Sequence, residues 1–148
     1  MNTIFDLSAA KEILGRIDQL NQDVQPGWGR MDAAQMLAHC SSFQDIATGK
    51  SRSSRSLLGI LIGKFVKPIF YSDKPLPHNM STIQSIMIVD QRDFEVEKEK
   101  LKQNIITLQR EGPGNDAIPH PFFGMLTSEQ WGRGIYKHLD HHLKQFGV

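Results

Sequence analysis

Three histidines in this chain have a spacing suited to binding a metal ion. His138 and His142 lie four residues apart near the C-terminus. In a helix this separation places both side chains on one face, about 6 Å apart at Cβ, so the two imidazoles can chelate one ion. His39 lies much earlier in the chain. A third imidazole directed into the same core would complete a site with open coordination positions, as catalytic metal sites have.

The histidine pair lies on a predicted helix of residues 127–146, which begins with a Thr127-x-x-Gln130 capping box. The helix carries two stripes: Trp131, Ile135, His138, His142 and Gln145 on one, and Tyr136, Leu139, Leu143 and Phe146 on the other. The second, apolar stripe is expected to pack against the rest of the fold. A solvated first stripe is the alternative, since histidine suits the C-terminal end of a helix dipole. Its tryptophan and isoleucine favour burial, and therefore a metal site.

His39 lies on another predicted helix, residues 32–47, where Asp32 and Gln35 form a variant of the capping box. The core-facing stripe of this helix is Met36, His39, Phe43 and Ile46. His39 therefore replaces an apolar residue on the buried side. A lone histidine in such a position is more often a hydrogen-bonded core residue than a metal ligand, so the spacing alone leaves both interpretations open.

Apolar periodicity predicts two further helices, over residues 8–20 and 93–110. A long connection, residues 49–89, separates the second helix from the third. Four helices with one long crossover indicate an all-α four-helix bundle, an architecture that builds metal sites from facing helices. With 148 residues, no repeat and no linker, the chain is expected to form one domain, residues 1–148.

The long connection has a composition of its own. Residues 50–56 are basic and serine-rich, which suits either a solvated loop or the binding of an anionic substrate. Residues 57–66 form a short amphipathic piece expected to end before Pro68, and residues 83–89 look extended. The stretch 57–70 is too apolar to lie exposed. We expect it to be ordered and to cover the open end of the site or to contact a second subunit, which would make the protein a homodimer.

Composition excludes several classes of function. Lys and Arg (17) nearly cancel Asp and Glu (16), so no net field recruits nucleic acid or a membrane. The single cysteine excludes an internal disulfide. The N-terminus lacks the basic start and apolar run of a signal peptide, and the longest apolar stretch is too interrupted to span a bilayer. A small-molecule substrate and a reducing, cytoplasmic location are therefore expected.

Four blocks of this sequence are similar to a known family: Trp28-Gly-Arg-Met31, Gln35-Met-Leu-Ala-His39-Cys40, His120-Pro-Phe-Phe-Gly124, and the C-terminal block from His138 to Val148. Together they resemble an uncharacterised bacterial family of the DinB/YfiT-like superfamily, over essentially the whole chain. The resemblance implies a four-helix bundle with a divalent metal ion held by His39, His138 and His142. Better-known relatives transfer or isomerise substrates with a low-molecular-weight thiol or are thought to be metal-dependent hydrolases.

Two residues of the last helix are candidates for positions beside the metal ligands. His141 lies three residues after His138 and about 100° round the helix from His142. It is expected near the site or at the surface, and an exchange of roles between His141 and His142 is the main alternative ligand set. Gln145 lies one turn after His142, from where it can orient a ligand.

Three residues elsewhere have both a functional and a structural interpretation. His120 either lines the pocket or is a loop histidine fixed by its two flanking prolines. Trp131 either walls the pocket or belongs to the core. Cys40 neighbours His39 but points to another side of the helix, and is expected to be a small buried filler rather than a ligand or nucleophile.

These features predict a metal-dependent enzyme of thiol-dependent transferase or hydrolase type. Zinc and nickel suit three imidazoles first, with iron or manganese as alternatives. A bound divalent ion would lower the pKa of water or ionise a thiol, and the lack of acidic residues on the histidine stripes favours the thiol. The rival interpretation is a non-catalytic, metal-stabilised helical bundle that acts as a ligand-binding or stress-related module.

Overall fold

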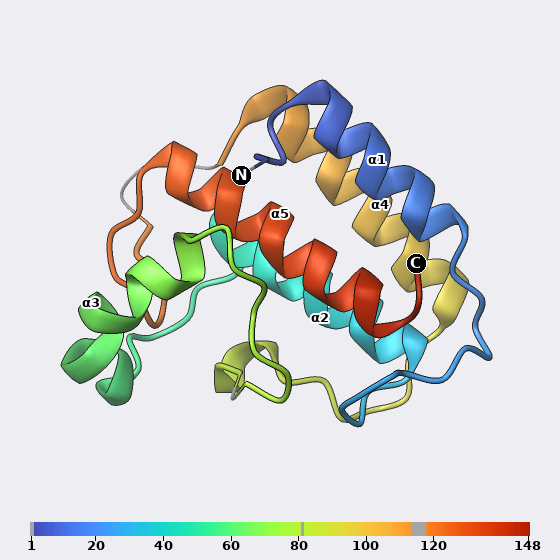
Figure 1. Cartoon of the computed structure of the whole chain (residues 1–148), viewed down its shortest axis with the longest axis horizontal. Helices are drawn as coiled ribbons and strands as arrows, with labels where there is room; N and C mark the ends of the chain where they lie inside the picture. Colours follow the sequence, from blue (N-terminus) through green and yellow to red (C-terminus); the bar gives the residue numbers. More distant parts are fainter. Residues whose placement is uncertain (1, 81, 114–117) are drawn as a thin grey trace.

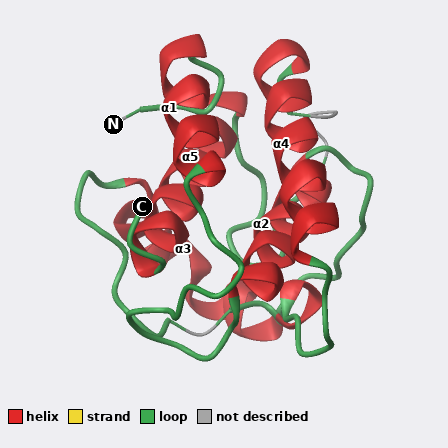
Figure 2. Ribbon diagram, turned by 90° about the vertical axis from the view of Figure 1, so that its right-hand side faces the viewer, coloured by secondary structure: helices red, strands yellow, loops and turns green. Residues whose placement is uncertain are grey.

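The computed structural model describes residues 2–80, 82–113 and 118–148, apart from the side chains of Ile69 and Phe70. The helices are α1 (Leu7–Asp18), α2 (Ala33–Ala47), α3 (Leu57–Tyr71), α4 (Phe94–Glu111) and α5 (Ser128–Gln145), with one 3-10 turn, η1 (Gln84–Ile86). Within these residues there is no strand (Figure 2). The expected all-α class is confirmed, but the expected number of four helices is wrong, because the long connection contains a fifth.

Four of the five helices surround a common core. Helix α1 contacts α4 and α5, and α2 contacts the same two partners, so the four elements form a closed ring. Figure 1 shows α1 beside α4 and α5 lying across α2, so that helices distant in sequence become neighbours. Helix α3 lies at one side of this ring, where it contacts α5. The ring therefore brings α2 and α5, the two histidine-bearing helices, face to face.

Both predicted capping boxes are present at the starts of the histidine-bearing helices. At α2 the Asp32 carboxylate accepts from the backbone N–H of Gln35 at 2.7 Å, and the Gln35 amide oxygen accepts from the N–H of Asp32 at 3.1 Å. Thr127 and Gln130 exchange the same pair of bonds at α5, at 3.2 and 3.1 Å. Each box satisfies two backbone donors that the first turn would otherwise leave unpaired, which stabilises the helix start.

The core consists of the apolar stripes predicted from periodicity. The largest fully buried side chains of the four-helix ring are Ile13 and Ile17 of α1, Met36, Leu37 and Ile46 of α2, Leu101, Ile105 and Leu108 of α4, and Ile135, Leu139 and Leu143 of α5. Burying each such side chain stabilises the fold by about 1.5–3 kcal/mol. His39 and His142 are also buried, so they occupy positions in this core and not on the surface.

Helix α3 differs from the expectation for the long connection. It does not end before Pro68 but continues through it to Tyr71. Proline removes one backbone hydrogen bond from a helix interior, the bond to the carbonyl of Lys64. Pro68 and Lys64 are both exposed, so water can donate a hydrogen bond to the Lys64 carbonyl. Residues 83–89, expected to be extended, contain the 3-10 turn η1, and the backbone is extended at Ile83 and Met87 on either side of it.

The packing of α3 rests on two glycines. A Cβ added at Gly59 would lie 2.6 Å from the Cα and the carbonyl oxygen of Phe122, and one at Gly63 would also collide with that oxygen. The helix therefore approaches the turn of residues 120–124 backbone to backbone. Its opposite side is exposed, with Leu57 80%, Leu61 70% and Phe65 68% accessible. The expectation of a regular element in this stretch agrees with the helix, but Leu57, Leu61 and Phe65 are not covered by other described residues.

No helix within the described residues is long and apolar enough to cross a membrane.

Candidate metal centre

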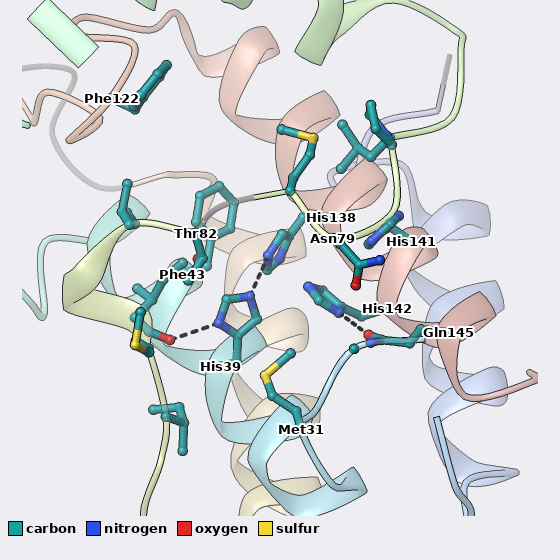
Figure 3. Close-up of a pocket in the computed structure, with 18 of the residues that line it drawn as sticks. Met31, His39, Phe43, Asn79, Thr82, Phe122, His138, His141, His142 and Gln145 are labelled. Atoms are coloured by element: carbon teal, nitrogen blue, oxygen red, sulfur yellow. Dashed lines mark hydrogen bonds between the residues drawn. The ribbon is translucent and has the colours of Figure 1, made fainter. Parts of the chain in front are cut away.

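Three histidines from two helices meet in the core. His39 comes from α2, and His138 and His142 come from α5 (Figure 3). One ring nitrogen from each lies within 4.8 Å of the other two, and the Nε2 atoms of His39 and His138 are 3.0 Å apart. Two nitrogens bound to one ion at about 2.0–2.1 Å are separated by roughly 3.3 Å in a tetrahedral site. The spacing is therefore that of a pair of ligands to one ion.

The protonation of His39 is set by a backbone carbonyl. Its Nδ1 lies 2.8 Å from the carbonyl oxygen of Ile86, in the turn η1. A carbonyl can only accept, so Nδ1 carries the proton and Nε2 keeps a lone pair directed at the cluster. Metal-binding histidines commonly use their second nitrogen in this way, and the contact fixes the ring orientation. The long crossover thus supplies one of the groups that orient the site.

His142 is oriented by a chain of two hydrogen bonds that ends at Trp28. The Gln145 amide N–H donates to the backbone oxygen of Trp28, so the amide oxygen must face the other way. That oxygen accepts from Nδ1 of His142 at 2.8 Å. The Nε2 atom of His142 is therefore unprotonated and directed at the other two rings (Figure 3). Gln145 therefore lies beside His142, within hydrogen-bond distance of it.

His138 shows that the histidines are incompletely paired by themselves. If its Nε2 donates to Nε2 of His39, its Nδ1 is a buried acceptor, and this atom has no hydrogen-bond partner in the described structure. His142 Nε2 is a second acceptor directed at the same cluster. Nε2 of His138 can donate its one proton to only one of these two acceptors, whereas a cation among the three rings would accept a lone pair from each. The donor set fits a divalent ion.

All three imidazoles are neutral near pH 7, as metal binding requires. Burial lowers the pKa of His39, although its hydrogen bond to Ile86 opposes the shift. Burial, followed by the neighbouring histidines, holds the pKa of His138 well below its usual value. Burial and the proximity of His39 lower the pKa of His142 to about 3, against the opposing effect of Gln145.

The cluster opens into a cavity of about 470 Å³. Its walls come from α2, α5, Val66 of α3, the turn of residues 120–124 and the crossover residues 76–80 and 82–88, and also include the segment around Trp28. A cavity of this size accommodates a small molecule. An ion at the cluster would therefore be reached by a ligand from the cavity side, while the protein supplies three nitrogens from the other side.

Two further predicted residues, His141 and His120, line the same cavity. His141 is half-buried, with its ring centroid 5.2 Å from that of His142 and 5.4 Å from that of Trp28. It lies beside the cluster and is not part of the group of three. His120 is buried, and its Nδ1 accepts from the backbone N–H groups of Phe122 and Phe123 at 3.0 and 3.1 Å. Both interpretations of His120 thus apply, since it faces the cavity and holds its own turn.

Trp131 and Cys40 belong to the core. Trp131 is buried behind the rings of Phe43 and His120, at centroid distances of 6.0 and 5.4 Å, and does not line the cavity. It supports the wall without forming it. Cys40 is buried beside Met36, and burial raises the pKa of its thiol far above the usual value. A protonated, enclosed thiol is neither a ligand nor a nucleophile.

The crossover contributes side chains to the cavity that sequence patterns did not indicate. His78 stacks on Trp28 with ring centroids 3.8 Å apart, and its ring lies 6.2 Å from that of His141. Leu76, Ile83 and Met87 line the cavity. Two features of the sequence pointed to these segments: the prolines Pro75 and Pro77, and the block that contains Trp28. They indicate turns or loops of defined conformation, but not that these segments contact α5.

Fold and site together define an all-helical protein with a three-histidine cluster placed to hold a metal ion. The chain belongs to the DUF1569 family, described as a protein of unknown function, whose model matches residues 2–147. No curated protein and no solved structure matches it.

Proposed function

We propose that this protein is a metal-dependent enzyme of thiol-transferase or hydrolase type, with His39, His138 and His142 as the metal ligands. The observation that supports the proposal most is the position of the three nitrogens on the wall of a cavity. No acidic residue lies among the described residues that line this cavity, so none of them supplies a carboxylate as fourth ligand. This arrangement is typical of catalytic sites, which keep a position open.

A divalent ion held by three neutral imidazoles would keep its full charge and lower the pKa of a water or thiol beside it. The chain itself orients the ligands through Ile86 and Gln145. His141 is the candidate to accept the released proton, because it lines the cavity and is neutral. Burial and the charge of His78 lower its pKa. His120 is less suited, since its Nδ1 already accepts two backbone bonds.

We also propose that the ring of α1, α4, α2 and α5 is a four-helix bundle of the DinB/YfiT-like superfamily. The support is the order of contacts and the placement of one histidine on α2 and two on α5. The ion expected first is zinc or nickel. The rival proposal, a bundle whose metal is only structural, requires a closed coordination sphere and loss of the fold without metal.

The test is elemental analysis of untagged wild-type protein beside the His142→Ala variant. Wild type should hold about one ion per chain, and the variant none, with an unchanged far-ultraviolet dichroism spectrum. The matched control is His78→Ala, which removes an exposed histidine outside the cluster and should keep the ion. Turnover of a thiol-conjugation or ester panel that disappears with the ion then supports the enzyme. An unfolded apo-protein without turnover supports the rival.

A further inference from the structure

The cavity is positively biased. Neutral imidazoles contribute no charge, so a divalent ion at the cluster would bring two uncompensated positive charges. None of the described residues that line the cavity is acidic. Arg30 lines the same cavity, is exposed to solvent and has no acidic partner within the described chain. Uncompensated charge beside buried groups such as His39 and His142 is costly. The occupant of the cavity should therefore bring negative charge.

Most of the remaining wall is apolar, although Asn79 and Thr82 also line the cavity. Phe43 comes from α2, Val66 from α3, and Phe122 from the turn that supports α3. Leu76, Ile83 and Met87 come from the crossover. These side chains offer no hydrogen-bond donor or acceptor, so a polar body in contact with them would lose its water without compensation. The negative charge must then sit at one end of the occupant, beside the histidines, with an apolar body along this wall.

We propose that the cavity binds a small organic anion with an apolar body, its charged head directed at the three histidines. This proposal rests on the proposed metal centre. It narrows the class of substrate, because it specifies an apolar body as well as a charged head. A carboxylate and a thiolate head meet the same charge requirement. The three methionines of the wall, Met31, Met80 and Met87, suit a flexible chain, since methionine adapts to irregular shapes.

The test is isothermal titration of zinc-loaded protein with octanoate and shorter carboxylates down to acetate. Each added methylene that enters the cavity should tighten binding roughly three- to fourfold. Octylammonium, which has a body one methylene longer and the opposite charge, should not bind. Octanedioate, which has the same head and a charged far end, should bind at least about tenfold more weakly than octanoate. Hexane-1-thiol and heptanoate have apolar bodies of the same length, so a comparison of their affinities then distinguishes the two heads.

A matched pair of variants tests the location. Met80→Glu adds a charge to the cavity wall and should weaken octanoate binding about tenfold or more, with zinc affinity retained. Met125→Glu makes the same change at a methionine of similar exposure, 56% against 46% for Met80, that does not line the cavity, and should leave both affinities unchanged.

The outcomes separate this inference from the metal centre. Zinc binding together with charge- and length-dependent octanoate binding supports both. Zinc binding without octanoate binding, or with equally tight binding of octylammonium or octanedioate, overturns the inference and leaves the metal centre standing. Wild-type protein that holds no zinc overturns both. Equal effects of Met80→Glu and Met125→Glu would place the ligand outside the cavity and overturn the inference.

Discussion

At the scale of single residues, we expect the metal affinity of the proposed site to depend on groups that do not touch the ion. Gln145 is held at both ends, by the backbone oxygen of Trp28 and by Nδ1 of His142. Its role is to keep the His142 proton on Nδ1 and the lone pair on Nε2. In known metal sites, loss of a group that orients a ligand commonly weakens metal binding by roughly 10- to 100-fold.

We therefore expect Gln145→Met to raise the dissociation constant for zinc by about 10- to 100-fold. The measurement is competition against a chromogenic chelator. Gln103→Met, at an exposed position of α4, is the control and should bind zinc like wild type. Unchanged affinity in Gln145→Met would show that His142 needs no support or is not a ligand.

A second prediction at this scale concerns His120 and pH. Burial, followed by the charges of Arg55 and Lys67, lowers its pKa to about 3, against about 6.5 in an unfolded chain. Between these values the unfolded state binds more protons. The stabilisation is therefore complete above about pH 6.5 and is lost as the pH falls towards 3. Protonation would also end the two bonds that Nδ1 accepts.

Between pH 8 and pH 5, His120 should account for a loss of about 2 kcal/mol in the free energy of unfolding. In His120→Asn the side-chain oxygen can accept the same bonds but does not titrate, so the acid-side loss should be smaller by that amount. The measurement is urea unfolding of metal-free protein at both pH values. Each protein is compared with itself at the two pH values, so any loss of packing in the variant that does not depend on pH cancels. If the free energy of unfolding falls equally in both proteins between pH 8 and pH 5, His120 is not the group responsible.

At the scale of elements, α3 is held by its glycines and by the turn that it contacts. The backbone N–H of Ser56 donates to the carbonyl of Pro121 at 2.9 Å, at the start of the helix. Gly59 and Gly63 then face Phe122. Because Val66 of α3 lines the cavity, the position of this helix also shapes the candidate site.

Gly59→Ala should loosen α3, because its Cβ would lie 2.6 Å from the backbone of Phe122 and backbone cannot easily move aside. Hydrogen exchange should accelerate in α3 and leave α1, α2 and α4 unchanged. Gly15→Ala in α1 is the control, since its Cβ meets nothing within 4 Å. That variant should be more stable by about 1 kcal/mol, from helix propensity alone. Unchanged exchange in Gly59→Ala would refute the close approach.

The exposed apolar side of α3 leads to a prediction about assembly. Contiguous apolar surface on a soluble protein commonly marks an interface, and we expect a second copy of this chain to cover it as a homodimer. The double variant Leu61→Glu, Phe65→Glu should be monomeric in sedimentation velocity at concentrations where wild type is dimeric. Val96→Glu is the matched control, since Val96 is 63% exposed on α4. A wild-type protein that is monomeric at all concentrations would contradict the proposed homodimer.

At the scale of the whole molecule, we expect the core and the proposed metal centre to contribute separately to stability. The four-helix ring is packed by its apolar stripes. A ligand that binds only the folded state adds stability that grows with the logarithm of its concentration relative to the dissociation constant. The metal should thus stabilise a fold that already exists, unlike the ion of a zinc finger.

Zinc at a hundred times its dissociation constant should raise the free energy of unfolding by about 2.7 kcal/mol. Chelation should reverse this gain and leave the far-ultraviolet dichroism spectrum unchanged. His142→Ala should show no gain, while His78→Ala, with its ligand set intact, should gain as much as wild type. Helical signal that disappears on chelation would show that the metal is structural.

The helices and the candidate ligands followed from local pattern. Four stripes and two capping boxes predicted α1, α2, α4 and α5 within one or two residues, because periodicity and capping depend on neighbours in sequence. The i, i+4 pair of His138 and His142 was visible for the same reason. His39 was ambiguous by spacing and was assigned as a ligand through the family resemblance.

Tertiary structure alone decided what surrounds the site. Sequence patterns did not indicate that the Ile86 carbonyl orients His39, or that Trp28 and His78 stack beside His141. The continuation of α3 through Pro68 was also unforeseen. These contacts join residues distant in the chain through irregular segments, which carry no periodic signal. The cavity arises where those segments meet α2 and α5, so its position and lining depend on how the elements pack together.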